Sequence, residues 1–94
     1  ILAVEGVDGV FIGPADLCTD MGYAGNAAAP EVRDVIADAI ERISAAGKAP
    51  GILGVTPEAT QAYFDMGAQF LAVGIDVLIL ARTARDLAAF WYAQ

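Results

Sequence analysis

Residues 6–17, GVDGVFIGPADL, decide how the rest of the chain is interpreted. The apolar run at residues 10–12 is continuous rather than alternating, which is the pattern of a strand buried on both faces of a parallel sheet. Gly13 and Pro14 end that strand, and Asp16 follows at once. Because parallel α/β folds bind ligands at the carboxyl ends of their strands, Asp16 is the first candidate for a functional carboxylate.

The segments on either side of this strand are predicted to be a helix end, a long loop and a helix. Residues 1–5 are expected to close a helix, with Gly6 at its C-terminal cap. Residues 15–29 show no sustained period and are expected to form a loop, whose length is unusual in a compact domain. A helix with one apolar face is predicted to begin at Pro30 and to end at Gly47.

Two further strand-to-helix steps complete the chain. Residues 49–53 are predicted to form a short strand, and Thr56 is expected to cap the helix that follows. A third buried strand is predicted at residues 70–73, and Asp76 is expected to cap a last helix that runs to about residue 92. That helix is apolar around most of its surface, which predicts burial on more than one side, against another chain or a missing segment.

The predicted order is therefore β-α-β-α-β-α, with spacings that suit right-handed crossovers in one parallel sheet. Three such units do not close into a barrel, and an open sheet of this size would leave both edges bare. The fold class expected for residues 1–94 is thus α/β, as one part of a larger barrel or sheet.

Composition excludes several classes of function. The net charge of −7, from 12 acidic and 5 basic residues, disfavours nucleic acid as a partner. No apolar run approaches the roughly 18–20 residues that a membrane span needs. Cys18 is the single cysteine and histidine is absent, which excludes an internal disulfide, Ser-His or Cys-His catalysis and histidine metal ligation. A single cysteine fits a reducing cytoplasm, so a cytoplasmic protein is expected. The N-terminal residues lack the features of a signal peptide and look like the interior of a longer chain.

Four stretches together carry a resemblance to a known family: GVDGVFIGPADL, MGYAGN with PEV after it, AAGKAPGIL, and GAQFLAVGIDVLILAR. They resemble the C-terminal portion of the HpcH/HpaI aldolases over essentially the whole chain. The resemblance implies a (β/α)8 TIM barrel of the phosphoenolpyruvate/pyruvate type, to which residues 1–94 would contribute the last three βα units. It also implies a metal-dependent class II aldolase that cleaves 4-hydroxy-2-oxo acids to pyruvate and an aldehyde.

The resemblance assigns roles to three residues. Asp16 matches the aspartate that ligates a divalent cation, Mg²⁺, Mn²⁺ or Co²⁺. Ala15 and Asp16 match the backbone that receives the pyruvate carboxylate, and Leu53 matches an apolar residue near the pyruvate methyl. Cys18 stands where many members have serine. The remaining partners, a glutamate ligand, an arginine and a histidine, would lie before Ile1, so no catalytic residue is expected within this chain, and the isolated piece is expected to hold metal poorly and to be inactive.

Other interpretations remain open at this point. On residue type alone, Asp16 is equally suited to a turn or a helix start, and Leu53 to the core of a strand. The chain could belong to another metal-dependent lyase or hydrolase of the pyruvate/phosphoenolpyruvate barrels. It could also be a non-catalytic module that self-associates. The family implies a homo-oligomer in which the C-terminal helix packs on a neighbouring subunit.

Overall fold

A computed structural model describes residues 1–93, and over that range the chain forms three strands and four helices. Their bounds are β1 (Gly9–Ile12), α1 (Pro14–Asp20), α2 (Pro30–Ala45), β2 (Ala49–Leu53), α3 (Pro57–Asp65), β3 (Phe70–Ala72) and α4 (Asp76–Tyr92).

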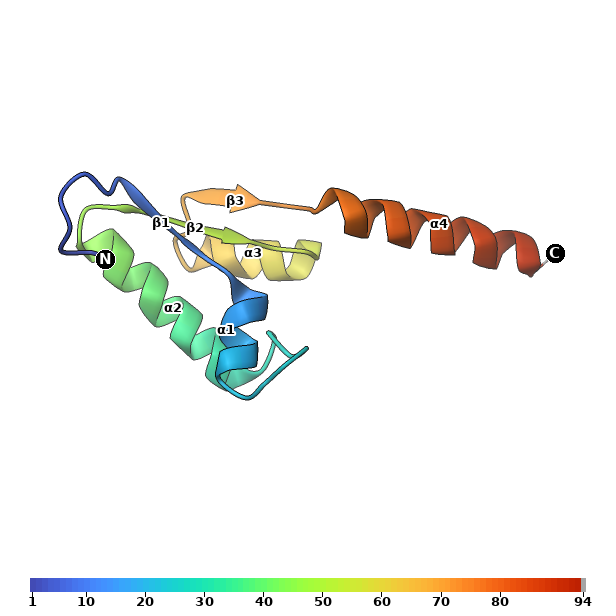
Figure 1. The fold of residues 1–94 in the computed structure, drawn as a ribbon, viewed down its shortest axis with the longest axis horizontal. Helices are drawn as coiled ribbons and strands as arrows, with labels where there is room; N and C mark the ends of the chain where they lie inside the picture. Colours follow the sequence, from blue (N-terminus) through green and yellow to red (C-terminus); the bar gives the residue numbers. More distant parts are fainter. Residues whose placement is uncertain (94) are drawn as a thin grey trace.

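The three strands form one parallel sheet in the order β1-β2-β3, as predicted. Ile12 of β1 pairs with Ile52 of β2, which pairs in turn with Leu71 of β3, so the carboxyl ends of the strands lie side by side. Helices α1, α2 and α3 cover one face of this sheet, whereas α4 extends away from it and gives the molecule extents of 57 × 26 × 21 Å (Figure 1).

The helix starts follow from local chemistry. Proline occupies the first turn of α1, α2 and α3, where its missing N–H is not needed. The Thr56 hydroxyl accepts a hydrogen bond from the Ala59 amide at 3.1 Å, which confirms Thr56 as the cap of α3. Helix α4 differs by one residue from the prediction: Ile75 is the N-cap and Asp76 is the first helical residue, with its carboxylate accepting from the Val77 amide at 2.8 Å.

The predicted helix over residues 1–5 is wrong, because this segment forms turns. Gly6 does adopt a positive φ of 89°, as expected of a chain reversal. The Lys48 ammonium donates to the carbonyls of Val7 at 2.6 Å and Val4 at 3.3 Å, and so ties the N-terminal segment to the start of β2. A charged donor thus satisfies carbonyls that a helix would have used itself.

The prediction of an unbroken loop over residues 15–29 is also wrong at its start, since α1 occupies most of its first half. Seven residues span two turns, too few for a periodic pattern to be visible in the sequence. The Cys18 and Thr19 side chains both donate to the Ala15 carbonyl, at 3.2 and 2.9 Å, and strengthen this short helix. Residues 21–29 form the remaining connection through turns at Gly22 and Gly25, both with positive φ.

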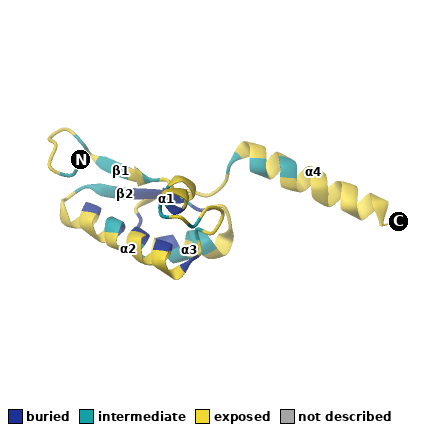
Figure 2. Ribbon diagram, turned by 60° about the horizontal axis from the view of Figure 1, so that its bottom comes forward, coloured by how far each residue is buried: buried dark blue, intermediate teal, exposed yellow. Residues whose placement is uncertain are grey.

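The core lies between the sheet and helices α1 to α3 (Figure 2). It is a continuous apolar cluster whose larger fully buried members come from α2 and β2. These are Val32, Ile36, Ile40 and Ile52. Cys18 of α1 and Tyr63 of α3 pack into the same cluster. The one apolar face predicted for the helix that begins at Pro30 is therefore the buried face of α2.

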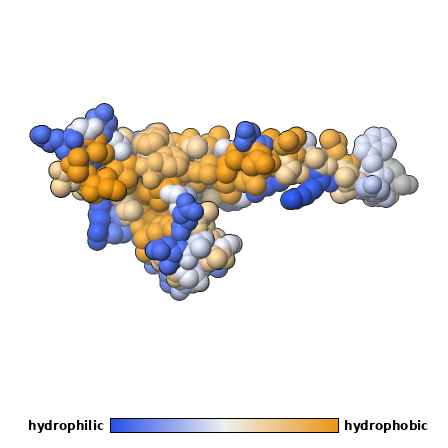
Figure 3. Space-filling view, in the orientation of Figure 1, coloured by the Kyte–Doolittle hydropathy of each residue, from blue (hydrophilic) through white to orange (hydrophobic). Residues whose placement is uncertain are grey.

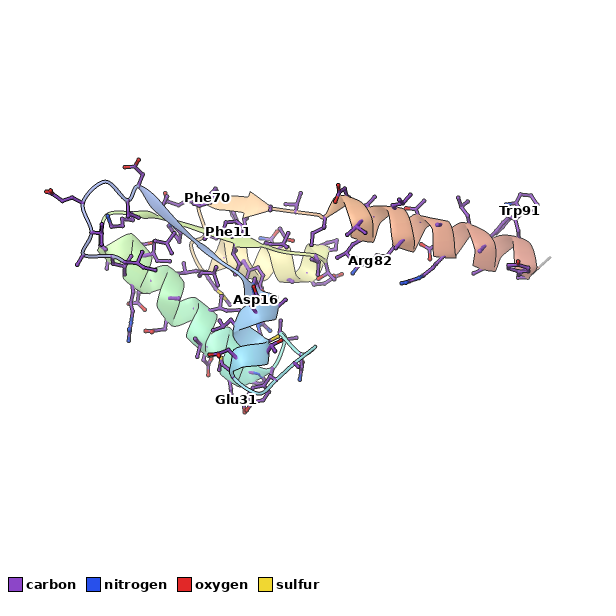
Figure 4. All side chains as sticks on the ribbon, viewed as in Figure 1. Phe11, Asp16, Glu31, Phe70, Arg82 and Trp91 are labelled. Carbon is purple, nitrogen blue, oxygen red and sulfur yellow. The ribbon has the colours of Figure 1, made fainter. Side chains whose placement is uncertain are left out.

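The other face of the sheet is uncovered over the described residues. Phe11 is 51% exposed and Phe70 is 43% exposed, so the described residues cover β1 and β3 on one face. The two rings lie against each other with centroids 5.8 Å apart (Figure 4). A side-chain carbon at Gly51 would collide with the Phe70 ring, so glycine is needed there for close approach. The face is thus apolar and packed within itself, but only one side of the sheet carries helices.

Helix α4 presents its apolar residues to solvent, because none of its described residues is buried. The burial expected against another chain or a missing segment stays a prediction. Figure 3 shows apolar surface running from the sheet onto this helix. Its exposed large apolar residues are Val77, Ile79, Leu80, Leu87, Phe90, Trp91 and Tyr92. Within the described range, no helix has both the length and the apolar character required to cross a membrane.

Candidate functional site

The three residues singled out from the sequence lie at one edge of the sheet. Ala15 and Asp16 are in the first turn of α1, directly after β1, and Leu53 is the last residue of β2. Because β1 and β2 are parallel neighbours, these positions come together at the carboxyl ends of the strands. Figure 4 shows Asp16 at the junction of β1 and α1.

Asp16 is exposed and its carboxylate is held close to the end of the strand. A side-chain carbon at Gly13 would lie 3.7 Å from Oδ2 of Asp16, so this carboxylate lies over the glycine that links β1 to α1. The first hydrogen bond of α1 runs from the Leu17 amide to the Gly13 carbonyl at 3.0 Å. The amides of Ala15 and Asp16 precede it and therefore have no acceptor within the helix.

Cys18 is a small core residue rather than part of an exposed site. It is 2% exposed, and its thiol donates to the Ala15 carbonyl at 3.2 Å. A thiol enclosed in the core is not accessible to a substrate. Its contribution is to fix the backbone of Ala15 in the first turn of α1.

A cavity of about 820 Å³ opens beside this edge, between α1, the connection after it, α3 and the start of α4. Ala15 and Leu53 both line it, whereas Asp16 does not. The structure therefore brings two of the three predicted residues to one cavity and places the third at its border. Most of the lining is apolar, with Ala59, Ala62 and Leu78 among the walls.

Sequence reasoning missed two polar residues of this cavity, Arg33 of α2 and Tyr63 of α3. Tyr63 belongs to the apolar stripe of its helix, and Arg33 comes from a different helix, so no spacing in the sequence joins them. Burial raises the pKa of the Tyr63 hydroxyl above its usual value, and the nearby Arg33 charge opposes that rise in pKa. Both side chains line the same cavity.

Because the pKa of Tyr63 is raised in the folded protein, the free energy of unfolding is expected to vary with pH in the alkaline range. In the unfolded chain this tyrosine ionises at its ordinary pKa near 10, whereas the folded protein keeps the proton to higher pH. The folded state thus binds more protons, so the free energy of unfolding is expected to decrease as pH rises above about 10. Urea denaturation at a series of pH values from 8 to 11 measures this decrease in the free energy of unfolding.

The matched control for this effect is Tyr63→Phe, which keeps the ring and removes the titrating hydroxyl. A shallower decrease above pH 10 is expected for this variant than for the unaltered chain. An identical slope in both proteins would show that Tyr63 titrates alike in the folded and unfolded states.

The loop after Leu53 is attached to α4. The Arg82 guanidinium donates to the Val55 carbonyl at 3.0 Å, and both side chains are exposed. The sequence contains no signal for a contact over 27 positions. This bond fixes the first turns of α4 next to the wall of the cavity.

The residues present supply one candidate metal ligand and not a complete set. Within residues 1–93, no group of three or more acidic, cysteine or histidine side chains is arranged to hold a metal ion. A hard divalent cation takes about six oxygen ligands, several of which can be water. Asp16 could contribute one carboxylate, and the described residues do not show where a second protein ligand would come from.

Parallel βα units with a carboxylate at a strand end place the chain among the α/β proteins that bind ligands at the carboxyl ends of their strands. Comparison with protein families narrows this class, because the model of the family described as HpcH/HpaI aldolase/citrate lyase matches residues 1–83. The chain belongs to the HpcH/HpaI aldolase/citrate lyase family, which confirms the resemblance found in the sequence.

Similar proteins agree with this family. The chain is 58% identical over its whole length to a 4-hydroxy-2-oxo-heptane-1,7-dioate aldolase of Shigella sonnei. It is 56% identical, over 97% of the chain, to a hydroxypyruvate/pyruvate aldolase of Roseovarius nubinhibens. The crystal structure of an HpcH/HpaI family protein from Burkholderia cenocepacia superposes with a TM-score of 0.86 at 33% identity, over 98% of this chain.

The chain spans about a third of the length of these proteins. It covers 36% of the Shigella sonnei aldolase, 35% of the Roseovarius nubinhibens aldolase and 36% of the Burkholderia cenocepacia structure. The parallel sheet with its helices therefore corresponds to one part of a larger barrel-type structure, which confirms the predicted fold class.

Proposed function

We propose that residues 1–94 form the last three βα units of a (β/α)8 barrel that cleaves 4-hydroxy-2-oxo acids to pyruvate and an aldehyde. The observation that carries this proposal is the position of Ala15 and Asp16 at the end of β1, beside Leu53 at the end of β2, in a member of an aldolase/citrate lyase family. The 4-hydroxy-2-oxo-heptane-1,7-dioate aldolase at 58% identity supports the same reaction class.

In the proposed reaction the proton of the 4-hydroxyl group is removed and the bond between carbons 3 and 4 breaks. The electron pair of that bond passes to the pyruvate half as an enolate, and carbon 4 leaves as the aldehyde. A proton added to carbon 3 completes pyruvate. We assign no proton-transfer group to this chain, because no side chain of the required kind is matched within it.

The residues of this chain would bind and orient the pyruvate half. The amides of Ala15 and Asp16, which have no helical acceptor, suit a carboxylate. Leu53, half-buried at the next strand end, suits the pyruvate methyl and excludes water from it. Asp16 would be one ligand of a divalent cation, Mg²⁺, Mn²⁺ or Co²⁺, and such a cation would supply positive charge that stabilises an enolate.

The test is an assay of pyruvate release by the complete barrel, with and without Mn²⁺. Release from 4-hydroxy-2-oxo acids is expected only when the cation is present, and none is expected from residues 1–94 alone. A complete barrel that releases no pyruvate from these substrates but cleaves another acid would favour a different metal-dependent lyase or hydrolase of the same superfamily.

We also propose that the protein is a cytoplasmic homo-oligomer in which α4 contacts a second subunit. The support is the row of exposed apolar residues on α4, from Val77 to Tyr92, which a monomer of these residues leaves in water. Sedimentation of the chain is expected to show a concentration-dependent oligomer. A well-folded monomer at all concentrations would contradict this contact between subunits. It would also contradict the alternative in which the chain is a non-catalytic module that self-associates.

A further inference from the structure

The loop after β2 joins the candidate site to α4. It consists of residues 54–56, between Leu53 at the end of β2 and Pro57, the first helical residue of α3. Val55 and Thr56 of this loop line the cavity of about 820 Å³, together with Leu53. The position of the loop therefore helps to set where Leu53 lies and how wide the cavity is at the end of β2.

Both ends of this loop are fixed by contacts from the sheet and from α3. The Gly54 amide donates to the Ala72 carbonyl of β3 at 2.9 Å, which continues the pairing of β2 with β3 by one residue. The Thr60 hydroxyl donates to the Thr56 carbonyl at 2.8 Å, and a side-chain carbon at Gly54 would collide with Thr60. Val55 lies between these fixed residues, and its side chain is exposed. The middle of the loop is therefore where a contact from another element can hold it.

Arg82 of α4 supplies such a contact. Its guanidinium donates to the Val55 carbonyl at 3.0 Å, and Figure 4 shows the Arg82 side chain between α4 and the start of α3. A hydrogen bond from a charged donor is stronger than one between neutral groups. None of the described residues of α4 is buried, so apolar packing within this chain does little to fix the helix. The Arg82 hydrogen bond acts at a place where packing does not.

The same hydrogen bond connects two walls of the cavity. Ile75 and Leu78, at the start of α4, belong to one wall, and Val55 and Thr56 belong to another. Arg82 follows Leu78 by about one helical turn, so both side chains extend from the same part of α4. The bond to the Val55 carbonyl therefore holds these two walls together, and without it α4 and the loop could separate.

We propose that Arg82 is a positioning residue, which holds α4 against the loop after β2 and thereby fixes Leu53 and the adjoining cavity for the pyruvate half of the substrate. This proposal rests on the proposed aldol cleavage, in which Leu53 lies against the pyruvate methyl. Arg82 itself touches no reacting atom in this arrangement. Its loss is therefore expected to weaken the binding of pyruvate more than it slows the reaction of the bound complex.

The first measurement is deuterium exchange of backbone amides in the complete barrel, followed by mass spectrometry of a peptide that covers residues 53–60. In Arg82→Gln this peptide is expected to exchange roughly 3–10-fold faster than in the unaltered protein, because local opening becomes easier when a charged hydrogen bond is removed. Arg82→Lys keeps a charged donor and is expected to fall between the two. Arg85→Gln is the matched control, because it removes the same charge from the same helix and leaves the Val55 contact intact. A peptide from α2, residues 36–45, is expected to exchange alike in all four proteins.

The second measurement separates positioning from a purely structural role through the kinetics of aldol addition of pyruvate to one fixed aldehyde. Arg82→Gln is expected to raise KM for pyruvate about 5-fold and to change kcat less than about 2-fold, whereas Arg85→Gln should change neither. Equal exchange of residues 53–60 in these two variants would overturn the proposal, and so would faster exchange in Arg82→Gln with an unchanged KM. Amide exchange needs no substrate, so it tests the Arg82 contact even if the complete barrel releases no pyruvate. That last result would contradict the proposed function instead.

Discussion

Replacing Ile52 by alanine is expected to lower the free energy of unfolding by about 2–5 kcal/mol, the range for removing a large aliphatic side chain from a packed core. Ile52 is fully buried in the middle strand, where it pairs with Ile12 and Leu71. It contacts the cluster that α2 and α3 bury against the sheet. Because domains are stable by only about 5–15 kcal/mol, this single change removes a large share of the total.

Urea denaturation followed by circular dichroism measures this loss. The matched control is Ile1→Ala, which removes the same atoms from a residue that is 82% exposed and is expected to change stability by less than about 0.5 kcal/mol. Similar losses in the two variants would show that the helix-covered face of the sheet is not the core that holds these residues together.

The positions of the strands were predictable from the sequence, because each strand is a short apolar run closed by glycine. Their parallel direction was predictable because a helix lies between each pair of successive strands. Val10 to Ile12, residues 49–53 and residues 70–73 all gave strands close to the predicted bounds. The helices over α2 and α3 were predictable for a second reason, since Pro30 and Thr56 mark their starts and their apolar residues repeat with helical spacing.

Helix α1 was not predictable, because two turns are too short to show a period and its stabilising contacts come from Cys18 and Thr19 to a backbone carbonyl. The exposure of Phe11 and Phe70 was not predictable from the sequence for a different reason. Their sequence pattern reports an apolar environment on both faces, but the described residues provide helices on one face alone. The pattern is thus consistent with a barrel interior that this part of the chain does not complete.

The candidate site was predictable at the strand ends and not in the cavity beyond them. Asp16 became a candidate through its position after a strand, where a parallel sheet collects its ligand-binding residues, whereas Leu53 was assigned only through the family resemblance. Arg33 and Tyr63 lie on different helices and line the same cavity only through the fold of the chain. No local spacing encodes such a pair, so only the three-dimensional arrangement identifies it.

Replacing Asp16 by asparagine in the complete barrel is expected to reduce pyruvate release at limiting Mn²⁺ by at least about 100-fold. Loss of a residue that only supports a metal ligand commonly lowers affinity or activity by roughly 10–100-fold, so the loss of a direct ligand should have at least that effect. Asparagine keeps the shape of the side chain and removes its negative charge. Activity measured over a range of Mn²⁺ concentrations, together with calorimetric titration of Mn²⁺, gives the change in affinity.

Asp20→Asn provides the matched control, because Asp20 is an exposed aspartate at the other end of the same helix. Asp20→Asn removes the same charge from α1, but at a distance from the end of β1. If Mn²⁺ were held only by the general negative charge of the chain, both variants would lose the same Mn²⁺ affinity. A ligand role predicts a loss in Asp16→Asn alone. If both variants bind Mn²⁺ as the unaltered protein does, Asp16 is a helix-start aspartate and the metal site must be sought elsewhere in the barrel.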